Sequence, residues 1–208
     1  YSFTKDVKEK TDITLSIGHT NATYDQAKEA FSLGCSHVTH LFNAMTPLNH
    51  REPGVVGASL TSDVFTELIA DTIHVNKQLF QFVLDNKGKE KIVLITDSMR
   101  GGCMKEGQYD LGGQRVVVKD GAARLESGNL AGSVLTLNKA IYNFLQNTNA
   151  TVAEVIHMAS LNPATSIGVS NRKGSLEIGK DADIAIFDEE MNCYLSIVEG
   201  REVYNQLD

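Results

Sequence analysis

Cysteine is scarce in this sequence, and long apolar runs are missing from it. The three cysteines, Cys35, Cys103 and Cys193, are odd in number and far apart among the 208 residues. They do not suit a disulfide framework, so a reducing cytoplasm is the expected location. No apolar run reaches membrane-spanning length and no signal peptide opens the sequence, so a membrane is not an expected partner.

An excess of basic residues is also lacking. Lysine and arginine total 19 against 26 acidic residues, which gives a formal net charge of −7. No basic cluster interrupts this balance, so nucleic acid is not an expected partner. The length suits one large domain, or a domain with a small appendage. The chain begins at Tyr1, and its polar first residues are typical of the end of a helix. We therefore expect it to be part of a longer protein.

What the sequence has instead is a repeat of apolar runs and helical segments. Ile13–Ile17 and His37–Phe42 have the composition of strands, and Tyr24–Leu33 between them has helical spacing. Strand, helix and strand in this order predict a βαβ unit with parallel strands. The pattern continues with an apolar strand, a helix with one apolar face and a short buried strand. Their expected bounds are Val64–Ala70, Asn76–Lys87 and Ile92–Ile95.

A polar residue follows each of the four predicted strands. These residues are His19, His40, His74 and Asp97. Functional groups in parallel sheets and barrels gather at the carboxyl ends of the strands. Two histidines at neighbouring strand ends can converge on one point, as metal ligands must. Taken singly, each histidine would more often be a structural residue, and Asp97 would more often be a helix N-cap.

The second half of the chain has a different texture. Glycines punctuate the segment at about 105–126, which we expect to form a hairpin excursion near the site. Helices are expected at about Val134–Gln146 and at Val152–Ser160, where Thr151 and Glu154 form a capping box. A short helix is expected to start at Asn162.

The expected domain boundary lies near residue 170, giving domains at 1–170 and 171–208. The second domain consists of short strands and turns. Its expected strands are Ile184–Phe187, Tyr194–Val198 and Arg201–Tyr204. Three strands are too few to be stable alone, so we expect them to pair with a segment that precedes Tyr1.

Six motifs make this chain resemble a known family. They are G-H-T-N-A at 18–22, T-H-L-F-N-A-M at 39–45, H-R-E-P-G at 50–54, D-T-I-H at 71–74, T-D-S-M at 96–99 and G-S-L-E-I-G-K-D-A-D-I at 174–184. Together they resemble the metal-dependent amidohydrolase superfamily and, within it, the N-acetylglucosamine-6-phosphate deacetylases. The second and third motifs are specific to these deacetylases, whereas the last is shared across the superfamily.

The resemblance implies an α/β fold in which this chain is the second half of a (β/α)8 TIM-like barrel. The chain would hold barrel strands five to eight and the C-terminal strands of a small β-sandwich domain. The first barrel strand and a metal-binding glutamate would lie before Tyr1. The resemblance also implies a homodimer.

The resemblance further implies a divalent metal, zinc as the first expectation, with iron, manganese or cobalt as alternatives, and one or two ions. His19 and His40 would bind it. Such an ion lowers the pKa of bound water to about 7. Asp97 would take the proton of that water and later give it to the leaving amine.

The expected substrate is a small phosphosugar, and the expected reaction is hydrolysis of the acetamide of N-acetylglucosamine 6-phosphate. Arg51 would bind the phosphate in a bidentate fork, assisted by His50, although a solvated surface arginine is the alternative. The other substrate-binding residues implied are Asn43, Ala44, Asp71, His74, Leu130, Ala131 and Gly132. Two alternatives stay open: another amidohydrolase, dihydroorotase-like or acting on N-acyl-amino acids, and an inactive fragment that lacks the first half of the barrel.

Overall fold

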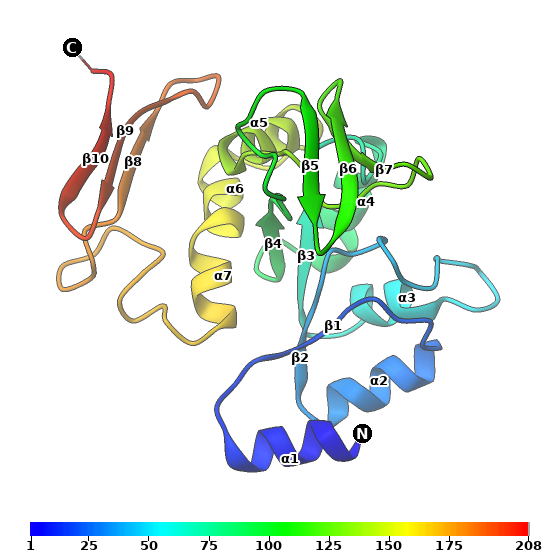
Figure 1. Cartoon of the computed structure of the whole chain (residues 1–208). Coiled ribbons are helices and arrows are strands. Elements are labelled where there is room, and N and C mark those ends of the chain that lie inside the picture. Colours follow the sequence, from blue (N-terminus) through cyan, green and yellow to red (C-terminus); the bar gives the residue numbers. More distant parts are fainter. Residues whose placement is uncertain (208) are drawn as a thin grey trace.

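The computed structural model describes residues 1–207 and shows an α/β protein, as predicted (Figure 1). Four parallel strands form one sheet in the order β1–β2–β3–β4. Their bounds are Leu15–Ile17, Cys35–Val38, Phe65–Ile69 and Ile92–Ile95. The helices that precede and connect them are α1 (Ser2–Lys10), α2 (Tyr24–Ser32), α3 (Gly54–Leu60) and α4 (Gln78–Lys87). All three pairings are parallel, so all four strands end at the same edge.

Strand β2 ends earlier than the apolar pattern predicts. The prediction ran from His37 to Phe42, but the strand stops at Val38. Beyond it the backbone has positive φ at His40, Phe42 and Ala44, with values of 30°, 76° and 49°. Such angles are incompatible with an extended strand. Leu41 is nevertheless fully buried in the core, and its N–H donates to the carbonyl of Glu67 at 2.9 Å. Its apolar character therefore resembles that of a strand residue.

Helix α3 was not predicted from the sequence. Its sequence, Gly-Val-Val-Gly-Ala-Ser-Leu, contains residues with low helix propensity. All seven of its residues are buried. Gly57 lies so close to Pro53 that a Cβ there would be 2.3 Å from the proline Cβ. Tertiary packing therefore decides the conformation of this segment, and local propensity does not.

Lys87, the last residue of α4, is hydrogen-bonded to the C-terminal end of α3. Its side chain is buried, and its Nζ donates to the backbone carbonyls of Ser59 and Ser62 at 2.8 and 2.6 Å. A cation beside these terminal carbonyls also complements the helix dipole. Burial lowers the pKa of the ammonium from 10.5 to about 8, against the opposing attraction of Asp63.

This depressed pKa predicts a pH dependence of stability. Below pH 8 Lys87 is charged in both states, and the cost of burying that charge is fully present. Between pH 8 and about 10.5 the unfolded chain binds more protons than the folded one, so this cost fades and stability rises. We expect the unfolding free energy of the wild type to rise from pH 8 to pH 10 relative to that of Lys87→Met. Urea denaturation of both at each pH measures it, and parallel pH profiles would contradict it.

Residues 107–125 form a small antiparallel sheet of three strands, in the segment for which a hairpin was predicted. Its strands are β5 (Gly107–Leu111), β6 (Gln114–Lys119) and β7 (Ala122–Leu125), in the order β5–β6–β7. A separate apolar cluster joins it to the end of β4, through buried Met99, Val116, Val118, Ala123 and Ala131. The excursion is thus anchored beside the end of β4.

The remaining elements complete the cover of β4 and form the tail. Helices α5 (Leu137–Gln146), α6 (Val152–Ala159) and α7 (Leu161–Ser166) pack against β4. The capping box at Thr151 and Glu154 is confirmed.

Strands β8 (Ile184–Phe187), β9 (Cys193–Val198) and β10 (Arg201–Asn205) form an antiparallel sheet that lies to one side in Figure 1. Over residues 1–207, no helix has both the length and the apolar character needed to cross a membrane.

Candidate functional site

The backbone is unusual just beyond each parallel strand. His19, His40, Thr72 and Asp97 follow β1, β2, β3 and β4, and their φ angles are 46°, 30°, 70° and 48°. Residues other than glycine seldom adopt positive φ, which costs energy unless the surroundings enforce it. Four such residues at one edge of one sheet mark that edge as the place where function is expected.

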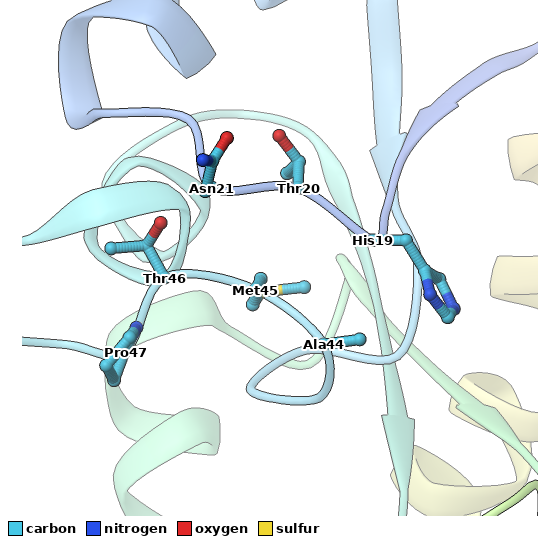
Figure 2. Close-up of a pocket in the computed structure, with 7 residues that line it drawn as sticks. All are labelled: His19, Thr20, Asn21, Ala44, Met45, Thr46 and Pro47. Atoms are coloured by element: carbon cyan, nitrogen blue, oxygen red, sulfur yellow. The ribbon is translucent and has the colours of Figure 1, made fainter.

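His19 and His40 meet at this edge. Their Nε2 atoms are 2.9 Å apart, and the rings meet edge to face with centroids separated by 4.7 Å. Two nitrogens bound at about 2.0–2.1 Å to one tetrahedral zinc ion lie about 3.3 Å apart. The two imidazoles therefore face a common point at a spacing close to that of a ligand pair. Figure 2 shows the His19 ring at one end of the pocket described below.

Two imidazoles are only part of a donor set for a metal. Within residues 1–207, no group of three or more His, Cys, Asp or Glu side chains could hold an ion. Structural and catalytic zinc sites use at least three protein ligands. The pair thus fits a metal in donor type and spacing, and it needs at least one ligand from elsewhere.

Glu67, which was not predicted as a site residue, supports His40 from the middle of β3. Its Oε2 accepts the backbone N–H of His40 at 3.1 Å, and its Oε1 lies 3.0 Å from Nε2 of His37. Burial alone would raise the pKa of this carboxyl, but the hydrogen bonds to His37 and His40 outweigh burial and lower it. The group is therefore a carboxylate at neutral pH. A lone charge inside an otherwise uncharged strand was the available signal.

Asp71 holds His74 after β3. Its Oδ2 lies 2.6 Å from Nδ1 of His74, and its Oδ1 accepts the backbone N–H groups of Ile73 and His74, each at 2.8 Å. Burial opposes ionisation of Asp71, but these bonds prevail and lower its pKa. With Nδ1 so engaged, His74 has only Nε2 left for a ligand. Asp71 was predicted to bind substrate, but both of its carboxylate oxygens are hydrogen-bonded to Ile73 and His74 and orient these residues.

The loop at 127–133 lies directly against the end of β4. Ser133 donates its N–H to the carbonyl of Asp97 at 2.7 Å and accepts from the N–H of Met99 at 2.9 Å. Gly132 has a φ of 63°, and a Cβ there would lie 3.2 Å from the Asp97 carbonyl oxygen and 3.1 Å from Met99 Cβ. Glycine allows this close approach. The predicted segment Leu130–Gly132 is therefore beside Asp97, whose side chain is exposed.

A pocket of about 800 Å³ opens between the loops after β1 and β2 (Figure 2). Backbone bonds from Thr20 to Ala44 and from Thr46 to Thr20 join these loops. Its lining residues are His19, Thr20, Asn21, Ala44, Met45, Thr46 and Pro47. The predicted residues His19 and Ala44 thus share one hollow.

Arg51 lies in a neighbouring hollow. That pocket, of about 490 Å³, includes Arg51 and Glu52 and shares Asn21 and Thr46 with the first. Of the other predicted substrate residues, His50 is exposed on the same loop. The amide of Asn43 donates to the carbonyls of His40 and Leu41, at 3.3 and 3.1 Å, and so shapes the loop.

Comparison with known proteins gives a consistent picture. The model of the amidohydrolase family matches residues 4–205. An N-acetylglucosamine-6-phosphate deacetylase of Lysinibacillus sphaericus is 45% identical over 193 residues, which cover 92% of this chain and 50% of that protein. The crystal structure of a deacetylase of the same name from Pasteurella multocida superposes with a TM-score of 0.94 at 35% identity, covering 98% of this chain and 54% of the other.

A shorter relative has a different sugar in its name. A putative N-acetylgalactosamine-6-phosphate deacetylase of Escherichia coli strain K12 is 43% identical over 163 residues, which cover 78% of this chain and 97% of that protein. By contrast, this chain spans about half the length of the L. sphaericus and P. multocida proteins.

Proposed function

Because this chain belongs to the amidohydrolase family, we propose that it forms the second half of a (β/α)8 barrel. Strands β1 and β4 are the two edges of the parallel sheet, and a barrel removes such edges by pairing them with further strands. Relatives of about twice this length have room for those strands. The tail sheet β8–β10 would belong to the small β-sandwich domain, with the boundary near residue 170.

The proposed reaction is hydrolysis of the acetamide of N-acetylglucosamine 6-phosphate to glucosamine 6-phosphate and acetate. The observation that carries it is the meeting of His19 and His40 at 2.9 Å, at the strand edge that also carries His74 and Asp97. The names of the L. sphaericus and P. multocida relatives supply the substrate class. These relatives make a dihydroorotase-like or N-acyl-amino-acid deacylase the weaker alternative.

His19 and His40 would hold a divalent metal, zinc first, with iron, manganese or cobalt as alternatives and with one or two ions bound. Further ligands would come from the other half of the barrel. When bound, such an ion lowers the pKa of a water molecule to about 7 and polarises a carbonyl. We keep a homodimer and a cytoplasmic location as predictions, the latter supported by the lack of a disulfide framework.

The side chains of this chain would move and orient the reacting groups. Asp97 takes the proton of the attacking water and returns it to the departing amine nitrogen. His74, with Nδ1 fixed by Asp71, turns Nε2 to the sugar or to the carbonyl oxygen. The backbone around Ala44 and Leu130–Gly132 lines the sugar site, and Arg51 with His50 binds the phosphate.

A second candidate substrate is N-acetylgalactosamine 6-phosphate. The E. coli K12 relative, which is covered over 97% of its length, has this sugar in its name. The two sugars differ only in the configuration at C4, so the same acetamide chemistry and phosphate binding apply to both.

The function is tested by acetate release from each sugar phosphate and from unphosphorylated N-acetylglucosamine, with the complete barrel and metal supplied. We expect Arg51→Ala to raise KM for the phosphorylated substrate by about 10- to 150-fold, because charge-assisted hydrogen bonds contribute about 1.5–3 kcal/mol. Activity on the unphosphorylated sugar should change little.

Arg201→Ala is the matched control, since Arg201 is an exposed arginine on β10, away from the parallel sheet. It should leave both KM values as in the wild type. Equal losses on the phosphorylated and unphosphorylated sugars would make Arg51 a structural residue. If neither sugar phosphate released acetate, the proposed function would be wrong.

A further inference from the structure

Glu67 connects two histidines on the inner face of the parallel sheet. Side chains alternate along β3, so that Thr66 bonds Ser59 of α3 on the helix side while Glu67 lies on the other face. There its carboxylate lies 3.0 Å from Nε2 of His37 and 3.1 Å from the backbone nitrogen of His40. The His37 ring and the Glu67 carboxylate are 7% and 21% exposed. The three groups form one packed unit behind the strand edge.

Within residues 1–207, no protein group restrains the ring of His40 at its second nitrogen. Metal-binding histidines almost always donate the second ring nitrogen to a carboxylate, a carbonyl or water, which fixes the ring. Nδ1 of His40 is buried, yet no residue of 1–207 is hydrogen-bonded to it. The restraint that the structure shows acts instead on the backbone, at a residue with a φ of 30°.

We propose that Glu67 is a positioning residue, which directs the His40 imidazole toward His19 by holding the backbone N–H of His40. This inference rests on the proposed function, in which His40 binds a metal. Rotation of the His40 peptide would swing its Cα–Cβ bond and carry Nε2 away from the point that it shares with His19. Glu67 prevents that rotation without touching the ring.

His37 serves the same unit by fixing the carboxylate. Its Nε2 is hydrogen-bonded to Oε1 of Glu67 at 3.0 Å. Its ring stacks on Phe65, with the centroids 6.2 Å apart and the planes inclined by 26°. Phe65 in turn lies under the ammonium of Lys91, 4.6 Å from the ring centroid. A carboxylate held at one oxygen by a packed ring offers its other oxygen in a fixed direction, which makes it a precise anchor for the His40 peptide.

The test compares two substitutions of nearly equal volume in the complete protein. Glu67→Gln keeps an oxygen that can accept from the His40 N–H, whereas Glu67→Met fills the space and keeps no acceptor of comparable strength. Thr66→Val, on the same strand but the opposite face, is the matched control. The zinc dissociation constant is measured by competition with a chromogenic chelator, and the absorption of the cobalt-substituted protein reports the ligand geometry.

We expect Glu67→Met to weaken zinc binding by about 10- to 100-fold. This is the usual loss when a group that is hydrogen-bonded to a metal ligand is removed. It should also alter the cobalt spectrum. Glu67→Gln and Thr66→Val should stay within about threefold of the wild type. Glu67→Met binding as tightly as the wild type, or Thr66→Val losing as much, would overturn the inference alone. A wild type that binds no zinc, or binds it equally well after His19→Ala, would overturn the proposed function as well.

Discussion

Asp97→Asn is expected to lower kcat by a factor of about 10²–10⁴, the usual contribution of a positioned acid or base. Asparagine keeps the size of the side chain but cannot accept and return a proton. Asp97 is exposed at the end of β4, and its carbonyl holds the N–H of Ser133, so the backbone there stays anchored in the variant. Binding of the metal and the substrate should therefore change little, and the loss should fall on kcat with KM nearly constant.

Asp120→Asn is the matched control for this substitution. Asp120 also has a positive φ, of 51°, but it lies in the turn between β6 and β7. Asparagine tolerates that backbone region as well as aspartate does, so both variants should fold. Steady-state kinetics and metal content are measured for both. A kcat of Asp97→Asn within about threefold of the wild type would remove Asp97 from the mechanism.

The parallel sheet could be predicted because its signals are local. Strand β4 has the predicted bounds, since Ile92–Ile95 is a short apolar run between polar neighbours. The end of β2 could not be predicted, because Leu41 is buried in the core although it lies beyond the strand, between residues with positive φ. Helix α3 was missed for a similar reason, since its glycines and valines become helical only through burial.

The candidate site could be predicted where its residues follow strands. The places of His19, His40 and Asp97 depend on the strand pattern alone, and the structure puts all three at one edge. The charge of Glu67 within β3 was a signal, but its partner could not be predicted, because His37 lies 30 residues away in the sequence. Asp71 and His74 are only three residues apart, so the hydrogen bond between their side chains could have been predicted from the local sequence.

His19→Ala is expected to weaken metal binding by at least about 100-fold. This exceeds the loss that is typical when only a group hydrogen-bonded to a metal ligand is removed. His19 is exposed, so alanine there removes little packing, and the folded structure should survive. His40→Ala should weaken binding as strongly, but His40 is buried, and that variant also loses stability from the space left behind. The His19 variant is therefore the cleaner measure of ligation.

Two measurements together test the ligand pair. Metal content after dialysis should fall in both variants and stay complete in His157→Ala, which changes an exposed histidine on α6. Added zinc should stabilise the wild type by about 2.7 kcal/mol at one hundred times its dissociation constant, because it binds the folded state. The same zinc concentration should leave His19→Ala almost unchanged. Full occupancy and full stabilisation in His19→Ala would exclude this histidine as a ligand, and the 2.9 Å contact with His40 would then be an ordinary hydrogen bond.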